Sequence, residues 1–187
     1  AINQDYIQPG QAFMAKVVSP GGNLDYTTEM QAHDDGNFYK SKEVWASVEL
    51  HIEGNGQTNS TAIGFHVDMT TGLDPSYDVA KLKGNPGLAL YSRLVEDNGK
   101  DFAIQALPEQ SIDNYEITLG VDFSATAVYT FSAIQENLDN YSIILEDRQE
   151  HTFTDLRWES YHANISESGI GRFYLHFKDA TAIGEMV

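Results

Sequence analysis

Apolar and polar side chains alternate with a period of two along most of this chain. Between residues 44 and 53 the even positions, from Val44 to Ile52, are apolar, whereas the odd positions, from Trp45 to Glu53, are mostly polar. Because successive side chains of a strand point to opposite sides, this alternation predicts a β-strand with one buried face. The same alternation or a β-rich composition recurs in the stretches 13–18, 62–69, 88–95, 102–107, 117–123, 127–133, 141–145 and 173–177.

Two Asn-Gly pairs mark turns between these stretches. Asn55-Gly56 precedes the run 62–69, and Asn98-Gly99 separates 88–95 from 102–107. Asn-Gly favours positive φ angles and therefore tight hairpins. About ten short strands separated by turns are typical of a sandwich. The sequence therefore predicts an all-β fold, an antiparallel jelly-roll-type β-sandwich that forms a single domain over residues 1–187.

The stretch 70–87 departs from the alternation. Asp74 is a favourable helix N-cap, Pro75 suits the first helical position, and Gly84 is a common stop signal. The sequence therefore predicts one short helical excursion between strands, over residues 74–82.

The charge balance excludes several classes of partner. The 187 residues include 11 Lys and Arg against 28 Asp and Glu, which makes the net charge −17. Nucleic-acid phosphates and anionic membrane surfaces would repel such a chain. The sequence has no apolar run of about 18 residues, so no membrane insertion is expected. Because cysteine is absent, disulfides and thiolate metal sites are excluded.

The sequence motifs of common enzymes are missing. There is no Gly-x-Ser-x-Gly elbow, no phosphate-binding loop and no His-Glu-x-x-His pair, and the six histidines are scattered. Spacing alone does not select a catalytic pair of carboxylates among 28 acids. We therefore expect a protein without catalytic residues.

Three acidic loops offer the oxygen ligands that calcium prefers. They cover residues 33–37, 68–78 and 96–101. The second is favoured because Asp74 and Asp78 recur within the length of one turn, so these two are the predicted metal ligands and calcium the predicted cofactor. The alternative is that these residues only shape turns, as Asp and Asn commonly do.

Aromatic residues among polar neighbours suggest a sugar-binding surface. Trp45 falls on the polar side of its strand, and Trp158 and Tyr161 stand in a charged stretch. An exposed aromatic ring stacks on the apolar face of a sugar, while polar side chains bind the hydroxyls. Trp45, Trp158 and Tyr161 are therefore the predicted ligand-binding residues. The alternative is that Trp45 packs under a loop and Trp158 plugs one end of the sandwich.

A series of short segments in a fixed order resembles a known region of large secreted proteins of Bacteroidota. The segments are 7–16 (IQPGQAFMAK), 30–31, 37–41 (NFYKS), 72–82 (GLDPSYDVAKL), 107–108, 144–147 (ILED) and 172–177 (RFYLHF). In those proteins the region is β-rich and lies just upstream of the C-terminal sorting domain of the type IX secretion system. The resemblance implies a secreted or cell-surface location, as a piece of a larger protein, and carries over no catalytic residue.

These observations together predict a non-catalytic binding module of a secreted or cell-surface protein. A polysaccharide or surface glycan is the expected partner, together with neighbouring domains of the parent protein. Two alternatives remain open. One is a structural spacer or protein–protein interaction domain of an adhesin, and the other is a polysaccharide hydrolase or lyase.

Overall fold

The computed structural model describes residues 27, 44–75, 77–82 and 87–180. The chain divides into two units, Ala1–Lys42 and Glu43–Val187, and the fold described below is that of the second. The predicted strand at 13–18 and the acidic loop at 33–37 lie outside the described residues. The prediction of a single domain over 1–187 stays a prediction.

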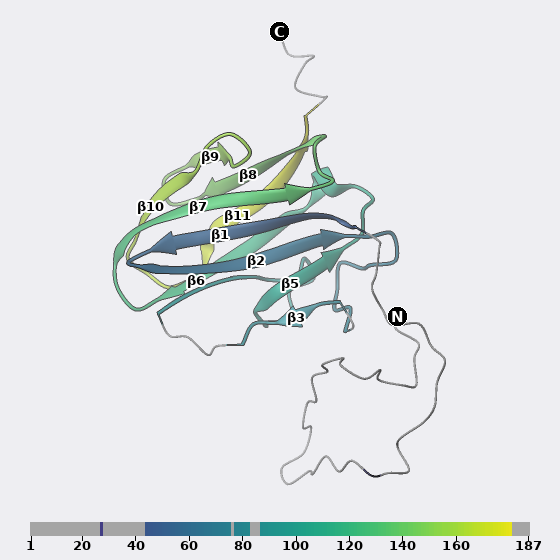
Figure 1. Cartoon of the computed structure of the whole chain (residues 1–187), viewed down its shortest axis with the longest axis horizontal. Helices are drawn as coiled ribbons and strands as arrows, with labels where there is room; N and C mark the ends of the chain where they lie inside the picture. Colours follow the sequence, from purple (N-terminus) through teal and green to yellow (C-terminus); the bar gives the residue numbers. More distant parts are fainter. Residues whose placement is uncertain (1–26, 28–43, 76, 83–86, 181–187) are drawn as a thin grey trace. The chain divides into compact units, whose positions relative to one another are not determined.

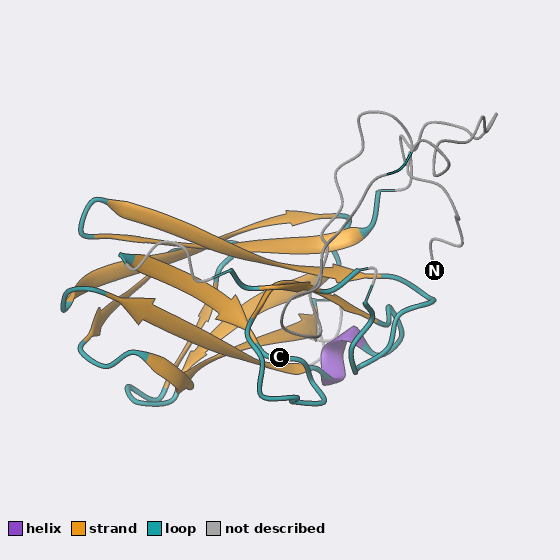
Figure 2. Ribbon diagram, turned by 90° about the horizontal axis from the view of Figure 1, so that it is seen from below, coloured by secondary structure: helices purple, strands orange, loops and turns teal. Residues whose placement is uncertain are grey.

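The regular secondary structure of the second unit is almost entirely β-strand, which confirms the predicted all-β class (Figure 1). The described residues form eleven strands. Their bounds are β1 Ala46–Gly54, β2 Gln57–Phe65, β3 Val79–Ala80, β4 Leu88–Ser92, β5 Phe102–Leu107, β6 Glu116–Phe123, β7 Ala127–Glu136, β8 Tyr141–Asp147, β9 Thr152–Asp155, β10 Tyr161–Ile165 and β11 Gly169–Asp179. Within the described ranges there is a single 3-10 turn, η2 (Ile112–Asn114), which lies at one end of the strands (Figure 2). No helix in the described part of the chain is long and apolar enough to cross a bilayer.

All the described strands belong to one sheet, which curls into a nearly closed, barrel-like form. The order is β10-β7-β1-β2-β5-β4-β6-β11-β8-β9, with β3 paired to β5. Most neighbours run antiparallel, but β2 and β5 are parallel. The arrangement of a jelly-roll sandwich is therefore not confirmed. The two ends of the order, β9 and β10, are joined by only five residues, 156–160, so the two edges of the sheet are held near each other.

The β1–β2 hairpin is the part of the fold that the sequence predicts most directly. Asn55 and Gly56 have φ angles of 50° and 71°, and the strands pair from Gly54 opposite Gln57 onward. On the inner side Val48, Leu50 and Ile52 are fully buried, as the alternation predicts.

Aromatic residues connect opposite walls of the interior. Phe65 on β2 meets Phe177 on β11 edge to face, with ring centroids 5.1 Å apart. Phe131 on β7 meets Phe173 on β11 at 4.8 Å. Because these strands are not neighbours in the sheet, these contacts fill the centre of the barrel and set its width.

The predicted helix over 74–82 is wrong. The chain makes one turn, in which the Asp78 amide donates to the Asp74 carbonyl at 2.8 Å, and then extends into β3 beside β5. The cause is the buried Asp78 carboxylate, which accepts hydrogen bonds from the backbone amides of Ala106 at 2.8 Å and Asp74 at 2.7 Å. A bond to a strand 28 residues away outweighs the local helix signals.

We expect Asp78→Ala to lower the free energy of unfolding by about 1–3 kcal/mol, because the buried Ala106 amide loses its acceptor. Urea unfolding measures the change. The matched control is Asp68→Ala, whose side chain is 76% exposed in the same loop and should change stability by about 0.5 kcal/mol or less. Equal stabilities for the two variants would contradict this role of Asp78.

Candidate functional site

Trp45 lies on the outer face of the β1–β2 hairpin, where the alternation places it. Its ring stacks on His66 with centroids 4.6 Å apart and lies at a tilt to Tyr77 at 5.3 Å. It also covers Gly64, where an added Cβ would come within 3.2 Å of the indole. Trp45 is half-buried and joins the loop that contains Tyr77 to the sheet.

The predicted metal ligands lie in that same loop. Asp74 accepts hydrogen bonds from the amide and hydroxyl of Thr70, at 2.7 and 3.1 Å. Both carboxylate oxygens of Asp78 accept hydrogen bonds from backbone amides. The burial of this carboxyl group raises its pKa above the ordinary value. The chain itself therefore supplies hydrogen-bond donors to both carboxylates, and calcium at Asp74 and Asp78 stays a prediction.

Trp45 and Tyr161 do not share a site. Tyr161 on β10 pairs with Phe131 on β7, which pairs with Ile52 on β1. Ile52 is seven residues from Trp45, which corresponds to about 23 Å along a strand. The structure thus separates the predicted ligand-binding residues, with Trp45 on one side and Trp158 and Tyr161 on the other.

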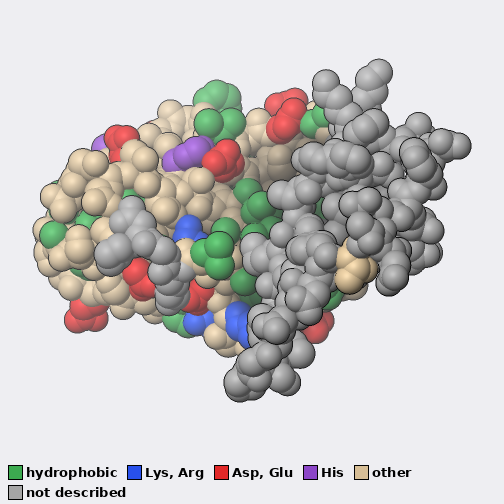
Figure 3. All heavy atoms as spheres, turned by 60° about the horizontal axis from the view of Figure 1, so that its bottom comes forward, with side chains coloured by type: hydrophobic (Ala, Val, Ile, Leu, Met, Phe, Trp, Pro, Cys, Tyr) green, Lys and Arg blue, Asp and Glu red, His purple; other side chains and the backbone are tan. Residues whose placement is uncertain are grey.

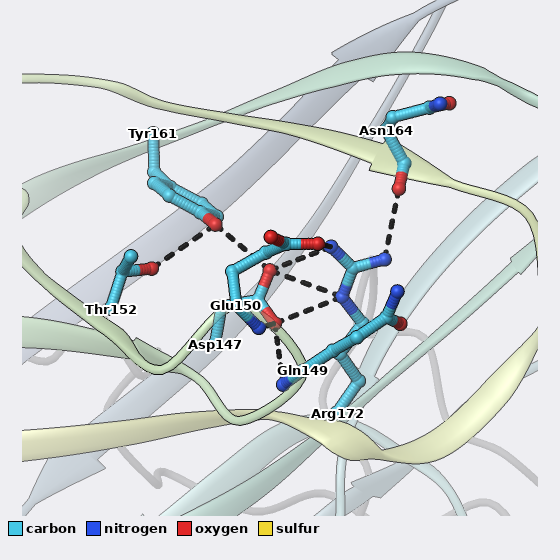
Figure 4. Close-up of polar contacts among 7 residues, drawn as sticks. All are labelled: Asp147, Gln149, Glu150, Thr152, Tyr161, Asn164 and Arg172. Atoms are coloured by element: carbon cyan, nitrogen blue, oxygen red, sulfur yellow. Dashed lines mark hydrogen bonds and ion pairs between the residues drawn. The ribbon is translucent and has the colours of Figure 1, made fainter.

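Tyr161 belongs to a polar network between the edges of the sheet (Figure 4). Its hydroxyl donates to Asp147 at the end of β8, at 2.9 Å, and accepts from Thr152 on β9 at 3.2 Å. Two guanidinium nitrogens of Arg172 on β11 donate hydrogen bonds to the Asp147 carboxylate at 2.7–3.0 Å. The third nitrogen donates to the backbone carbonyl of Asn164 on β10 at 2.9 Å. This seam network, defined as Asp147, Thr152, Tyr161 and Arg172, ties β8, β9 and β11 to β10.

The opposite charges of Asp147 and Arg172 stabilise the ionised form of each other. Burial alone would raise the pKa of Asp147, which is 1% exposed, but the hydrogen bonds from Arg172 and Tyr161 bring that pKa below its ordinary value. The same contact with Asp147 raises the pKa of Arg172. Burial, and then the neighbouring carboxylate, raise the pKa of Tyr161. The pair therefore stays ionised, and the tyrosine stays protonated.

Trp158 stands in the five-residue link between β9 and β10 and is 79% exposed. Its amide donates to the Asp155 carbonyl at 3.1 Å. The neighbouring Arg157 is anchored on Asp155 at 2.7 Å and on the Ser142 hydroxyl, with its guanidinium 5.3 Å from the indole centroid. Phe153, on the strand before the link, is 67% exposed. This part of the sheet thus displays two large aromatic side chains to solvent on a fixed backbone.

A polar cluster lies on the outer face beside Phe153. Arg148 donates to Glu116 at 2.8 Å and to Glu146 at 3.1 Å, and its guanidinium lies 3.4 Å above the ring of Tyr174. His176 meets the other oxygen of Glu146 at 2.8 Å.

Metal-ligand atoms converge in this outer cluster. One atom each from Glu116, Glu146 and His176 lies within 4.8 Å of the others, a donor set of the kind that binds transition metals. Arg148, however, already supplies the positive charge to both carboxylates.

A hollow of about 380 Å³ adjoins Arg148. It is lined by Val121, Arg148, Gln149, Glu167, Ser168, Gly169, Ile170, Gly171, Arg172 and Phe173. A bulge in β11 creates it, since the pairing with β6 shifts between Ile170 and Phe173. Gly169 and Gly171 take φ angles of 124° and 100° there, which L side chains rarely adopt. The volume lies within the usual range of small-molecule pockets, about 300–1,000 Å³.

Sequence reasoning singled out Trp158 and Tyr161 as candidates but did not point to the polar residues around them. Asp147 and Arg172 are 25 residues apart, and Arg148 and Glu116 are 32 apart, so no local motif marks either pair. Phe153 did carry a signal, because it is an aromatic residue between threonines just after a charged turn.

Comparison with known proteins gives one match. A family model described as a domain of unknown function (DUF8693) matches residues 1–177. Neither the curated proteins nor the solved structures include a match to this chain.

We expect Asp147→Asn to lower the free energy of unfolding by about 3–5 kcal/mol near neutral pH, because it leaves the largely buried Arg172 without its counter-charge. The folded-state pKa of Asp147 lies below its unfolded value of about 3.9. Its stabilising contribution is therefore present above that value and lost as the pH falls through the folded-state pKa. The difference between wild type and variant should shrink on acidification, as measured by urea unfolding across that range.

The control for this network is Glu150→Gln. Glu150 is exposed and lies 3.9 Å from Arg172, so its substitution should change stability by about 0.5 kcal/mol or less. A pH-independent difference between wild type and Asp147→Asn would show that the ion pair is not the cause.

Proposed function

The chain belongs to the family described as a domain of unknown function (DUF8693), and we propose that it is a non-catalytic carbohydrate-binding module. The observation that carries the proposal is the exposure of two large aromatic side chains, Trp158 and Phe153. Phe153 lies beside the outer cluster of hydrogen-bonding side chains. Exposed aromatic faces stack on sugar rings, and planar polar groups bind pairs of hydroxyls. The resemblance described above leads us to place the module in a secreted or cell-surface protein exported by type IX secretion.

The chemistry of the acids supports binding without catalysis. Burial would raise the pKa of Glu146, but Arg148 and His176 together hold it below its ordinary value, so Glu146 is a poor proton donor for glycoside hydrolysis. The raised pKa of Tyr161 makes it a poor proton acceptor for a lyase reaction. Both residues are engaged in ion pairs or hydrogen bonds that hold the sheet together.

A second candidate function is a protein-interaction domain, supported by an apolar surface elsewhere. Val79 and Ile104 are directly paired on β3 and β5, and both are exposed, as is the nearby Leu82. Figure 3 turns this side toward the viewer and shows apolar side chains (green) beside acidic (red) and basic (blue) ones. Such a patch fits the expected contact with neighbouring domains of a parent protein.

We expect Trp158→Ala to weaken retention on the glycan that the wild type binds by about tenfold, which corresponds to a loss of about 1.4 kcal/mol of stacking. Phe153→Ala should weaken it in the same direction. Affinity electrophoresis against a panel of soluble polysaccharides, followed by titration, measures both. Because the two side chains are exposed, neither change should shift the melting temperature appreciably.

The matched control is Leu82→Ala, which removes an apolar side chain of similar exposure, 72%, from the other surface. It should retain the glycan as the wild type does. Retention that is unchanged in Trp158→Ala but lost in Leu82→Ala would contradict the role of Trp158 and place the glycan on the other surface. Release of reducing ends or unsaturated products from the retained polysaccharide would establish an enzyme instead.

A further inference from the structure

The hollow at the β11 bulge continues the line of exposed aromatic residues, and we propose that the module binds an extended, uncharged glycan chain that runs from Trp158 past Phe153 into this hollow. The inference rests on the proposed function and deepens it. It names the ligand class as a neutral oligosaccharide several units long, and it adds Gln149 and Glu167 as ligand-binding residues.

The strand register places the parts of this track in order. The Trp158 N–H donates a hydrogen bond to the carbonyl of Asp155, and Asp155 lies opposite Ile144 on β8. Phe153 lies opposite Glu146, and Arg148 is two residues after Glu146 along the chain. From Ile144 to Arg148 the track therefore extends about 13 Å along the strand, which a single sugar ring does not span. A ligand in contact with both ends must be a chain.

The side chain of Arg148 links the two halves of the track. Its guanidinium lies over Tyr174 on the outer face, whereas the residue itself lines the hollow beside Gln149. The backbone N–H of Gln149 donates a hydrogen bond to the Asp147 carboxylate at 3.0 Å. The seam network therefore fixes the backbone from which the Gln149 side chain projects. Ile170 is 46% exposed and lines the same hollow, where it offers an apolar surface to a sugar ring.

The charges around the hollow favour a neutral ligand. Its two arginines are already paired with acids, Arg148 with Glu116 and Glu146, and Arg172 with Asp147. Glu167 adds a further carboxylate to the lining. With a net charge of −17 over the whole chain, uronate or sulfate groups would be repelled. Carboxylate, amide and paired guanidinium groups still bind hydroxyls well.

The test is calorimetric titration with cello-, xylo- and manno-oligosaccharides, from disaccharides to hexasaccharides, and with oligogalacturonates of the same lengths. For the neutral series that binds, the affinity of the wild type should rise with length and then level off. The Gln149→Ala/Glu167→Ala variant should lose at least fivefold affinity for the longest oligomers and leave the disaccharide unchanged. Trp158→Ala should weaken the binding of all lengths.

The matched control is Glu109→Ala/Gln110→Ala, which removes the same two kinds of side chain from an exposed loop before η2, and it should bind as the wild type does. Affinity that is independent of length, or unchanged in the hollow variant while Trp158→Ala still weakens binding, overturns the track but leaves the proposed function standing. Preference for the oligogalacturonates overturns the neutral class. No binding of any oligomer or polysaccharide overturns the proposed function itself.

Discussion

The edges of a β-sheet carry backbone N–H and C=O groups that must find partners, and in this domain the two edges are brought together by side chains instead of a continuous ladder. Asp147 is the centre of that closure. It is buried, carries a charge, and accepts hydrogen bonds from Arg172 and Tyr161 across the seam. A buried carboxylate is tolerated only when such partners are present, so the closure of the sheet and the ionisation of Asp147 depend on each other.

The bulge in β11 connects this closure to the surface. The extra residues between Ile170 and Phe173 turn Arg172 toward Asp147, and the same departure from regular pairing opens the hollow beside Arg148. The two glycines with positive φ make that backbone path accessible. A ligand in the hollow would therefore rest on the backbone that closes the barrel, which is a rigid support for recognition.

The arginines of this acidic protein are all paired with acids. The chain has four arginines, Arg93, Arg148, Arg157 and Arg172. Each forms an ion pair with an aspartate or glutamate. Two of them line the hollow and one supports Trp158. Their role is to hold loops and strand ends in place. The excess of acids would repel anionic partners, and this is why we propose a neutral ligand for the surface.

The sequence by itself determined the local structure. Its alternation located most strands and the buried face of β1, Asn55-Gly56 located the first hairpin, and its composition excluded thiolate chemistry and made anionic partners unfavourable. These features depend on neighbours a few residues apart.

The tertiary structure decided that the strands form one nearly closed sheet, that the segment after Asp74 extends instead of forming a helix, and that Trp45 is remote from Tyr161. In each case the deciding contact joins residues distant in the chain, such as Asp78 with Ala106 or Asp147 with Arg172. Buried polar groups must be satisfied wherever a partner lies in space, and local sequence patterns do not contain that information.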